Sequence, residues 1–205
     1  MKGLFIVFEG ITGSGKKTHI KLLAEKLKEI GKEVTILSFP NYESEIARFT
    51  KRADLDFYTQ SLLFAADRSL HQERIKGLLE KGNIILCDRY CYSNFAYQAA
   101  KGLPLEWLKE LEKHTIKPDI VFLIDVPVEI SINRVKQLSI EDFTKKEILE
   151  KLEREKDFLE KIREIYLRLA VTDKETKWFV INGSEDISVN HEKIWKKVKE
   201  ELKIE

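Results

Sequence analysis

The sequence predicts an α/β fold of three layers, in which a five-stranded parallel sheet carries helices on both faces. Five short apolar runs alternate along the chain with longer segments whose apolar residues recur at helical spacing. The chain has 205 residues, enough for one α/β domain with a substantial core and too few for two ordinary ones. It contains no repeat, low-complexity tract or linker, so residues 1–205 are expected to form a single domain.

The predicted strands are the apolar runs at 4–8, 34–39, 84–87, 120–124 and 178–181. The run at 84–87 is short and apolar throughout, as expected of a parallel strand buried on both faces. Because helices connect consecutive strands, the crossovers should be right-handed and ligands should bind beyond the carboxyl ends of the strands. That rule places Phe39, Asp88 and Asp125 at one edge of the sheet, beside the glycine-rich loop after the first strand.

The first predicted helix follows this loop and ends at Gly31. Its helical spacing is carried by Ile20, Leu22, Leu23, Leu27 and Ile30. Further helices are expected at 62–79, at 93–100, around 107–111, after Pro127, from Ile148 and at the C-terminus. The segment from about 137 to 147 is polar and has no helical period, so it is the candidate for a mobile flap.

Composition excludes several classes of function. With 36 Lys and Arg against 35 Asp and Glu, the chain has no global field to attract nucleic acid or an anionic membrane. It shows no secretory leader and no apolar run of spanning length, and its two cysteines suit reduced thiols, so a soluble cytoplasmic protein is expected. The four histidines lack metal-ligand spacing. Abundant Lys and Glu with a single Met indicate heat adaptation.

The loop at residues 9–18 has the spacing of a phosphate-binding loop. Gly10, Gly15 and Lys16 fit the pattern G-x-x-x-x-G-K between an apolar strand and a helix. Glycines let backbone N–H groups surround a phosphate, and the helix N-terminus adds partial positive charge. A Ser or Thr normally follows the lysine to ligate magnesium, but Lys17 stands there and Thr18 comes one residue late. The alternative interpretation of residues 9–18 is a glycine-rich turn before a helix that binds no phosphate.

A phosphate loop together with an Asp at the end of a neighbouring apolar strand is the minimum set for handling a nucleotide with magnesium. Lys16 would bridge the β- and γ-phosphates, and Asp88 would hold Mg²⁺ directly or through water. The alternative for Asp88 and Arg89 is a structural ion pair at the sheet edge. Phe64 and Arg68 are one helical turn apart and could stack on a base and grip a carbonyl or phosphate, or could simply belong to core and rim.

Three segments, at 8–18, 63–68 and 88–98, resemble in order and spacing the signature segments of thymidylate kinases. Those enzymes transfer a phosphoryl group from ATP to dTMP, making dTDP for dTTP biosynthesis. The resemblance extends from about Leu4 to Val198, and the run at 88–98 is its most specific part. It implies a P-loop nucleoside monophosphate kinase-like fold with a mobile lid at about 137–152, ATP as donor, Mg²⁺ as cofactor and a homodimer.

The resemblance also implies an acceptor site. Phe64 would stack on thymine, Arg68 would reach its edge and Arg89 would clamp the dTMP phosphate. The full set implied for dTMP is Glu9, Thr12, Phe39, Pro40, Phe64, Arg68, Arg89, Ser93, Tyr97 and Gln98. Within it, Ser93 and Gln98 would lie near the base, and Tyr97 would lie against the deoxyribose.

For the donor, the resemblance implies that Arg134 packs on adenine and that the loop at Gly183 passes its other side. The implied ATP-binding set is Gly10, Ile11, Thr12, Gly13, Ser14, Gly15, Lys16, Lys17, Thr18, Arg134 and Gly183. Lys16, Asp88 and Arg89 would be catalytic. Family members without an arginine in the loop usually carry one in the lid, where this chain offers Lys145, Lys146, Lys151 and Arg154.

Three positions depart from the family pattern. Thr12 stands where relatives usually have an Asp that contacts the 3′-hydroxyl, and Tyr42 stands where many have a phosphate-binding arginine. One alternative is therefore a nucleoside monophosphate kinase with altered or broadened acceptor choice. Another, suggested by Lys17, is a nucleotide-binding protein with impaired turnover. Lys17 either supplies part of the charge that a metal would bring to the phosphates or points into solvent.

Overall fold

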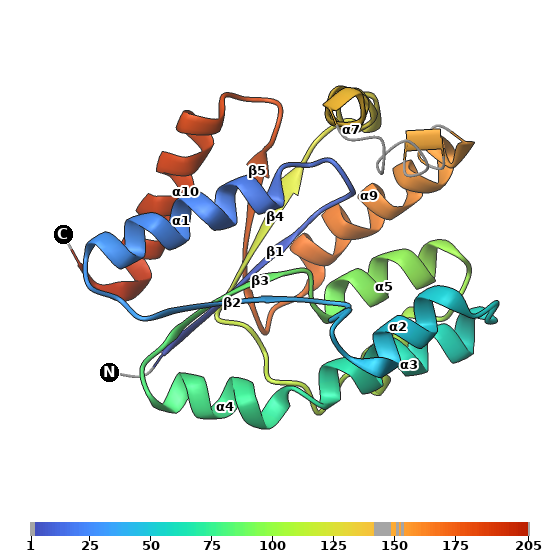
Figure 1. Ribbon diagram of the computed structural model, residues 1–205, viewed down its shortest axis with the longest axis horizontal. Helices are drawn as coiled ribbons and strands as arrows, with labels where there is room; N and C mark the ends of the chain where they lie inside the picture. The colour runs from blue at the N-terminus through green and yellow to red at the C-terminus, as the bar shows by residue number, and fades with distance from the viewer. Residues whose placement is uncertain (1–2, 142–148, 151, 153, 205) are drawn as a thin grey trace.

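The computed structural model describes residues 3–141, 149, 150, 152 and 154–204. A five-stranded sheet lies between two layers of helices (Figure 1). Its strands run parallel in the order β2-β3-β1-β4-β5. The strands are β1 Leu4–Glu9, β2 Val34–Ser38, β3 Ile84–Asp88, β4 Ile120–Asp125 and β5 Lys177–Asn182. The predicted fold class is confirmed, and each predicted strand forms with nearly the expected bounds.

The central strand β1 is buried along its whole length because both of its faces are covered. Leu4, Ile6 and Phe8 pack beneath α1 (Lys16–Glu29) and α10 (Ile187–Leu202). The alternate residues Phe5 and Val7 face the opposite helical layer. That layer consists of α4 (Gln72–Glu80), α5 (Cys91–Ala100) and α9 (Lys156–Thr172). The two-residue period of a strand therefore divides the core into two halves.

The long helix predicted for 62–79 is wrong, because the chain forms α3 (Phe57–Ser69) and α4 with a break at Leu70 and His71. The His71 ring Nδ1 lies 2.8 Å from the Asp67 carbonyl oxygen, the acceptor that the His71 N–H would use in a continuing helix. The His71 N–H donates instead to Arg68 O, at 3.0 Å. A side chain competing for a backbone acceptor thus ends the helix where the apolar period alone predicts continuation.

Three further helices complete the described fold: α2 (Glu45–Arg52), α6 (Leu105–Leu111) and α7 (Val128–Glu141). Helix α2 was not predicted from the sequence. It begins at Ser44, whose Oγ accepts a hydrogen bond from Ala47 N at 3.1 Å. Helices α2 and α3 pack against each other at one end of the molecule (Figure 1).

Helix α7 continues to Glu141, so the first part of the segment predicted to lack regular structure is helical. The helix predicted from Ile148 is interrupted: residues 149, 150, 152 and 154 are helical, Glu155 forms a turn, and α9 runs from Lys156. Of the predicted lid residues, Lys145, Lys146 and Lys151 lie outside the described residues, and Arg154 is exposed. Among the helices that the structure describes, none is long and apolar enough to cross a membrane.

Candidate active site

A cavity of about 760 Å³ opens at the carboxyl ends of the strands. One side of its wall is the glycine-rich loop from Thr12 to Thr18, and another is the end of β2 with Phe39, Pro40 and Tyr42. Asp88 and Arg89 contribute from the end of β3, and Arg134 and Gly183 close the side next to α10. The sheet edge therefore brings the glycine-rich loop, Arg134 and Gly183 together with Phe39, Pro40, Asp88 and Arg89.

The loop is kept tight by glycines whose neighbours leave no room for a side chain. Gly13 has φ of 80°, and a Cβ there would lie 2.5 Å from the Ser131 carbonyl oxygen. Gly10 has φ of 139°, and a Cβ there would lie 2.5 Å from Ile124 O. Both positions combine a positive φ with close backbone contact, so only glycine fits. Helix α1 begins directly after this loop and directs its N-terminus at the cavity.

Lys16 is buried at the base of the loop. Its Nζ donates to the carbonyl oxygens of Gly10 and Ile11, each at 3.0 Å, and lies 3.3 Å from Ser14 Oγ. Burial lowers the pKa of Lys16 to about 7; the positive charge of Arg89 adds to this, whereas Asp88 and Glu9 oppose it. A phosphate in the cavity would favour the charged ammonium, which is the group that binds it.

Asp88 is a buried carboxylate whose Oδ1 has no hydrogen-bond partner. An orphaned carboxylate oxygen in a cavity wall suits a cation or a water held by one. Within the described residues, no three His, Cys, Asp or Glu side chains cluster to form a metal site of their own. The donors present therefore fit Mg²⁺, which commonly takes one carboxylate and completes its octahedron with water and substrate phosphates.

Arg89 has φ of 68°, an uncommon conformation for a residue other than glycine. It is fixed by a 2.9 Å hydrogen bond from its N–H to Phe8 O, and its carbonyl oxygen accepts from Cys87 Sγ at 3.0 Å. The guanidinium lies over the ring of Tyr97, with 5.1 Å between Cζ and the ring centroid. Strain of this kind, maintained by neighbours on two strands, is typical of functional positions.

Arg134 joins the two sides of the expected donor site. Its Nη1 donates to Ser14 O at 3.2 Å, and its Nη2 donates to Gly183 O at 2.6 Å. A Cβ at Gly183 would lie 2.6 Å from Val126 Cγ1, so the turn after β5 packs tightly on the end of β4. Lys17 and Thr18 also line the cavity, and both side chains are exposed.

Asp125, the remaining carboxylate predicted at this edge, is held by α9. Its two oxygens accept from Arg163 Nε at 2.6 Å and from Arg163 Nη2 at 2.9 Å. This bidentate pair occupies the carboxylate. Asp125 is therefore less suited than Asp88 to hold a cation.

Phe64, Arg68 and Gln98, which are expected around the base, do not line this cavity. Phe64 is half-buried on α3, and Gln98 is buried with its Nε2 donating to Gln60 Oε1 at 3.0 Å. Arg68 is buried, and its Nε donates to both carboxylate oxygens of Glu112, at 3.0 and 3.1 Å. Its Nη2 also contacts Glu112, so the carboxylate grips one edge of the guanidinium.

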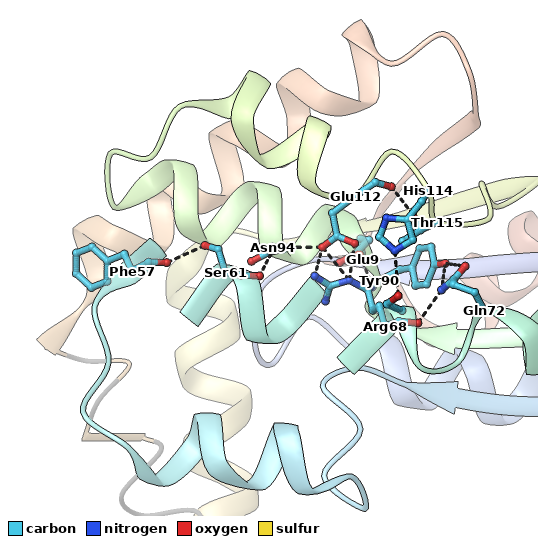
Figure 2. Close-up of polar contacts among 11 residues, drawn as sticks. Glu9, Phe57, Ser61, Arg68, Gln72, Tyr90, Asn94, Glu112, His114 and Thr115 are labelled. Atoms are coloured by element: carbon cyan, nitrogen blue, oxygen red, sulfur yellow. Dashed lines mark hydrogen bonds and ion pairs between the residues drawn. The ribbon is translucent and has the colours of Figure 1, made fainter. Parts of the chain in front are cut away.

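Figure 2 shows this buried ion pair within a wider polar network. Asn94 Nδ2 donates to Glu112 Oε1 at 3.2 Å and to Ser61 O at 3.3 Å, which ties α5 to α3. Sequence reasoning missed Glu112. Its neighbours Lys109, Glu110 and Lys113 make it look like part of a solvated helix end, and no local signal separates a buried Glu from exposed ones in such a stretch.

Glu112→Gln should destabilise the protein by about 3–5 kcal/mol, because Arg68 would remain buried without its counter-charge. Denaturant unfolding measures this loss. The matched control is Glu110→Gln, two residues before Glu112. It removes the exposed ion-pair partner of Lys113 and should cost less than about 1 kcal/mol. Equal losses in the two variants would contradict this role for the buried pair.

Comparison of the sequence with known proteins identifies its family. A sequence model of thymidylate kinase matches residues 8–194. The chain is 40% identical to a probable thymidylate kinase of Thermococcus kodakarensis, over 93% of this chain and 95% of that protein. It is 39% identical to a probable thymidylate kinase of Pyrococcus abyssi, over 98% of both chains. A thymidylate kinase of Plasmodium falciparum is 39% identical over 96% of this chain and 90% of its own. The chain belongs to the thymidylate kinase family.

Proposed function

We propose that this protein transfers the γ-phosphoryl group of ATP to the phosphate of dTMP, giving dTDP and ADP. The observation that carries the proposal is one continuous cavity whose wall combines the glycine-rich loop with Asp88, Arg89 and the Phe39–Pro40 turn. Donor and acceptor phosphates bound in such a cavity would meet between Lys16 and Arg89. Phosphoryl transfer depends mostly on positioning and charge stabilisation, and the residues of this wall supply both.

Each group has a distinct role in this proposal. The N–H groups of the loop and Lys16 hold the donor phosphates, and Arg89 holds the acceptor phosphate. Arg134 and Gly183 frame the adenine side, while Phe64 and Arg68 lie on the base side of the acceptor. Asp88 holds Mg²⁺ directly or through water, and the metal would neutralise charge on the β- and γ-phosphates. The lid side chains Lys145, Lys146, Lys151 and Arg154 are candidates for further phosphate contacts.

The assay that tests this function measures ADP release from ATP and Mg²⁺ with dTMP, dUMP, dCMP and dGMP as acceptors. We expect turnover to be highest with dTMP. Lys16→Met should lower kcat by about 10²–10³, because a charge that stabilises the transferring phosphoryl group is lost. Comparable rates with several acceptors would show broadened specificity from Thr12 and Tyr42. Nucleotide binding without turnover would show a binding protein.

The Lys- and Glu-rich composition calls for assays at elevated temperature, and we propose a cytoplasmic, heat-adapted enzyme.

Lys17 provides a second test, because it lines the cavity at the position where a hydroxyl would normally ligate the metal. We expect its ammonium to supply part of the positive charge near the phosphates. Lys17→Ser should therefore weaken ADP binding in EDTA by about three- to tenfold, and the loss should shrink with Mg²⁺ present. Calorimetric titration in each condition measures both values.

Lys21→Ser is the matched control, since Lys21 is exposed one turn further along α1 and lies outside the cavity wall. It should leave ADP binding unchanged. If Lys17→Ser behaves in the same way, Lys17 contributes no charge to the phosphates.

We also propose a homodimer, which the exposed apolar side chains of α2 and α3 support. Phe49, Phe57, Tyr58 and Leu62 are each about half exposed on these adjacent helices. Large apolar side chains exposed on adjacent helices are typical of protein–protein contact sites. Light scattering should give twice the 24.0 kDa mass of the chain, and Leu62→Lys should give the monomer mass. Val171→Lys, at an exposed apolar position on α9, should leave the mass unchanged. A 24.0 kDa particle for the unmodified protein would contradict the dimer.

A further inference from the structure

Arg89 is surrounded by hydroxyl groups rather than by carboxylates. Its Nη1 lies 3.1 Å from Ser93 Oγ and 3.4 Å from the Tyr166 hydroxyl. Its Nη2 lies 3.2 Å from the Tyr97 hydroxyl and 3.5 Å from Thr12 Oγ1. Within the described part of the chain, Arg89 forms no ion pair with a carboxylate. The guanidinium therefore keeps its positive charge available for an incoming anion.

Two carboxylates, Glu9 and Asp88, act on this charge, and Glu9 lies one hydroxyl layer away. Glu9 is fully buried, and its Oε2 accepts from Ser93 Oγ at 2.7 Å and from the Tyr166 hydroxyl at 2.8 Å. Its Oε1 accepts from Tyr90 N at 2.7 Å. A hydroxyl has one proton and two lone pairs. When Ser93 and Tyr166 donate to Glu9, their lone pairs are left to accept from Arg89.

Arg68, a buried arginine of the acceptor region, shows the alternative arrangement. Glu112 binds Arg68 directly along one edge of its guanidinium, with both side chains almost fully buried. A phosphate approaching Arg68 would have to displace that carboxylate. A phosphate approaching Arg89 needs only to replace weakly held hydroxyls, because Glu9 is kept at a distance by Ser93 and Tyr166. The two arginines are thus suited to different tasks.

We propose that Tyr166 is a positioning residue for the acceptor phosphate, whose hydroxyl holds Arg89 in place and keeps Glu9 from pairing with it. This inference rests on the proposed function and deepens it, because Arg89 is the group assigned there to the dTMP phosphate. Tyr166 comes from α9, which supplies none of the residues that the sequence predicts for the acceptor. Its ring is buried in the core, so only the hydroxyl is in contact with the polar network.

The experiment compares the binding of dTMP and thymidine, which differ only by the phosphate, to the unmodified protein and to Tyr166→Phe. The variant keeps the buried ring and removes the hydroxyl. We expect dTMP to bind about tenfold more weakly, the usual effect of a lost hydrogen bond near a charged group. Thymidine should bind within about twofold of its original affinity. Calorimetry gives both constants, and thermal unfolding checks the fold.

Tyr92→Phe is the matched control. Tyr92 is a buried tyrosine of α5 whose hydroxyl lies 2.8 Å from Asp173 Oδ2 and 2.9 Å from Thr176 Oγ1, away from Arg89. The Tyr92→Phe variant also loses one buried hydroxyl oxygen, and its binding of dTMP and of thymidine should be unchanged. A loss of dTMP affinity equal to that of Tyr166→Phe would show a general effect of removing a buried hydroxyl, and would overturn the proposal.

Combining Glu9→Gln with Tyr166→Phe tests the separation of charges. If Glu9 pairs with Arg89 once the Tyr166 hydroxyl is gone, removing the Glu9 charge should restore most of the dTMP affinity. A merely structural role for Tyr166 predicts no restoration, and that result would overturn the proposal. Equal weakening of dTMP and thymidine by Tyr166→Phe, or no weakening, would also overturn it. Absence of dTMP binding to the unmodified protein would instead reject the proposed function itself.

Discussion

The parallel pairing of β1 with β3 is the constraint on which the site depends. Its register sets Phe8 opposite Asp88, and the pairing continues as a hydrogen bond from Arg89 N to Phe8 O. The next residue along β1 is Glu9, directly before the glycine-rich loop. One ladder of backbone hydrogen bonds therefore places two carboxylates, a guanidinium and the phosphate loop at a single edge. A shift of one residue in this register would turn the side chains of β1 to the wrong faces of the sheet.

Buried and partly buried charges in this protein are compensated in two ways. Lys16 is satisfied by carbonyl dipoles of its own loop and Arg89 by hydroxyls, and both remain competent to bind an anion. Arg68 and Asp125 instead have direct bidentate partners on neighbouring elements. Desolvating an ion is costly unless its partners are well placed, so each arrangement must be built by the fold. The partner thus indicates whether a charge is open to an incoming ion or is already paired within the protein.

The sequence predicted the strands, the loop and the sheet edge because those features depend on local pattern. Short apolar runs between turn residues are typical of parallel strands, and β1, β3 and β4 are buried along almost their whole length. The glycine spacing follows from backbone geometry. The helix break at His71 was missed because it depends on one side-chain hydrogen bond, between the His71 ring and the Asp67 carbonyl oxygen. The spacing of apolar residues carries no information about such a bond. Glu112 and Tyr166 were missed because their roles arise from contacts with residues far along the chain. Neither residue type nor spacing reports a tertiary hydrogen bond.

Helix α9 contacts the edge of the sheet formed by the carboxyl ends of the strands at two positions that are one helical turn apart. Arg163 holds Asp125 at the end of β4, and Tyr166 holds Glu9 at the end of β1. Residues three apart lie on the same helical face, so both contacts come from one turn. The helix cannot rotate about its axis or slide along the sheet without breaking both. The orientation of Arg89 and the position of the β4 end are therefore mechanically coupled through a single turn of α9.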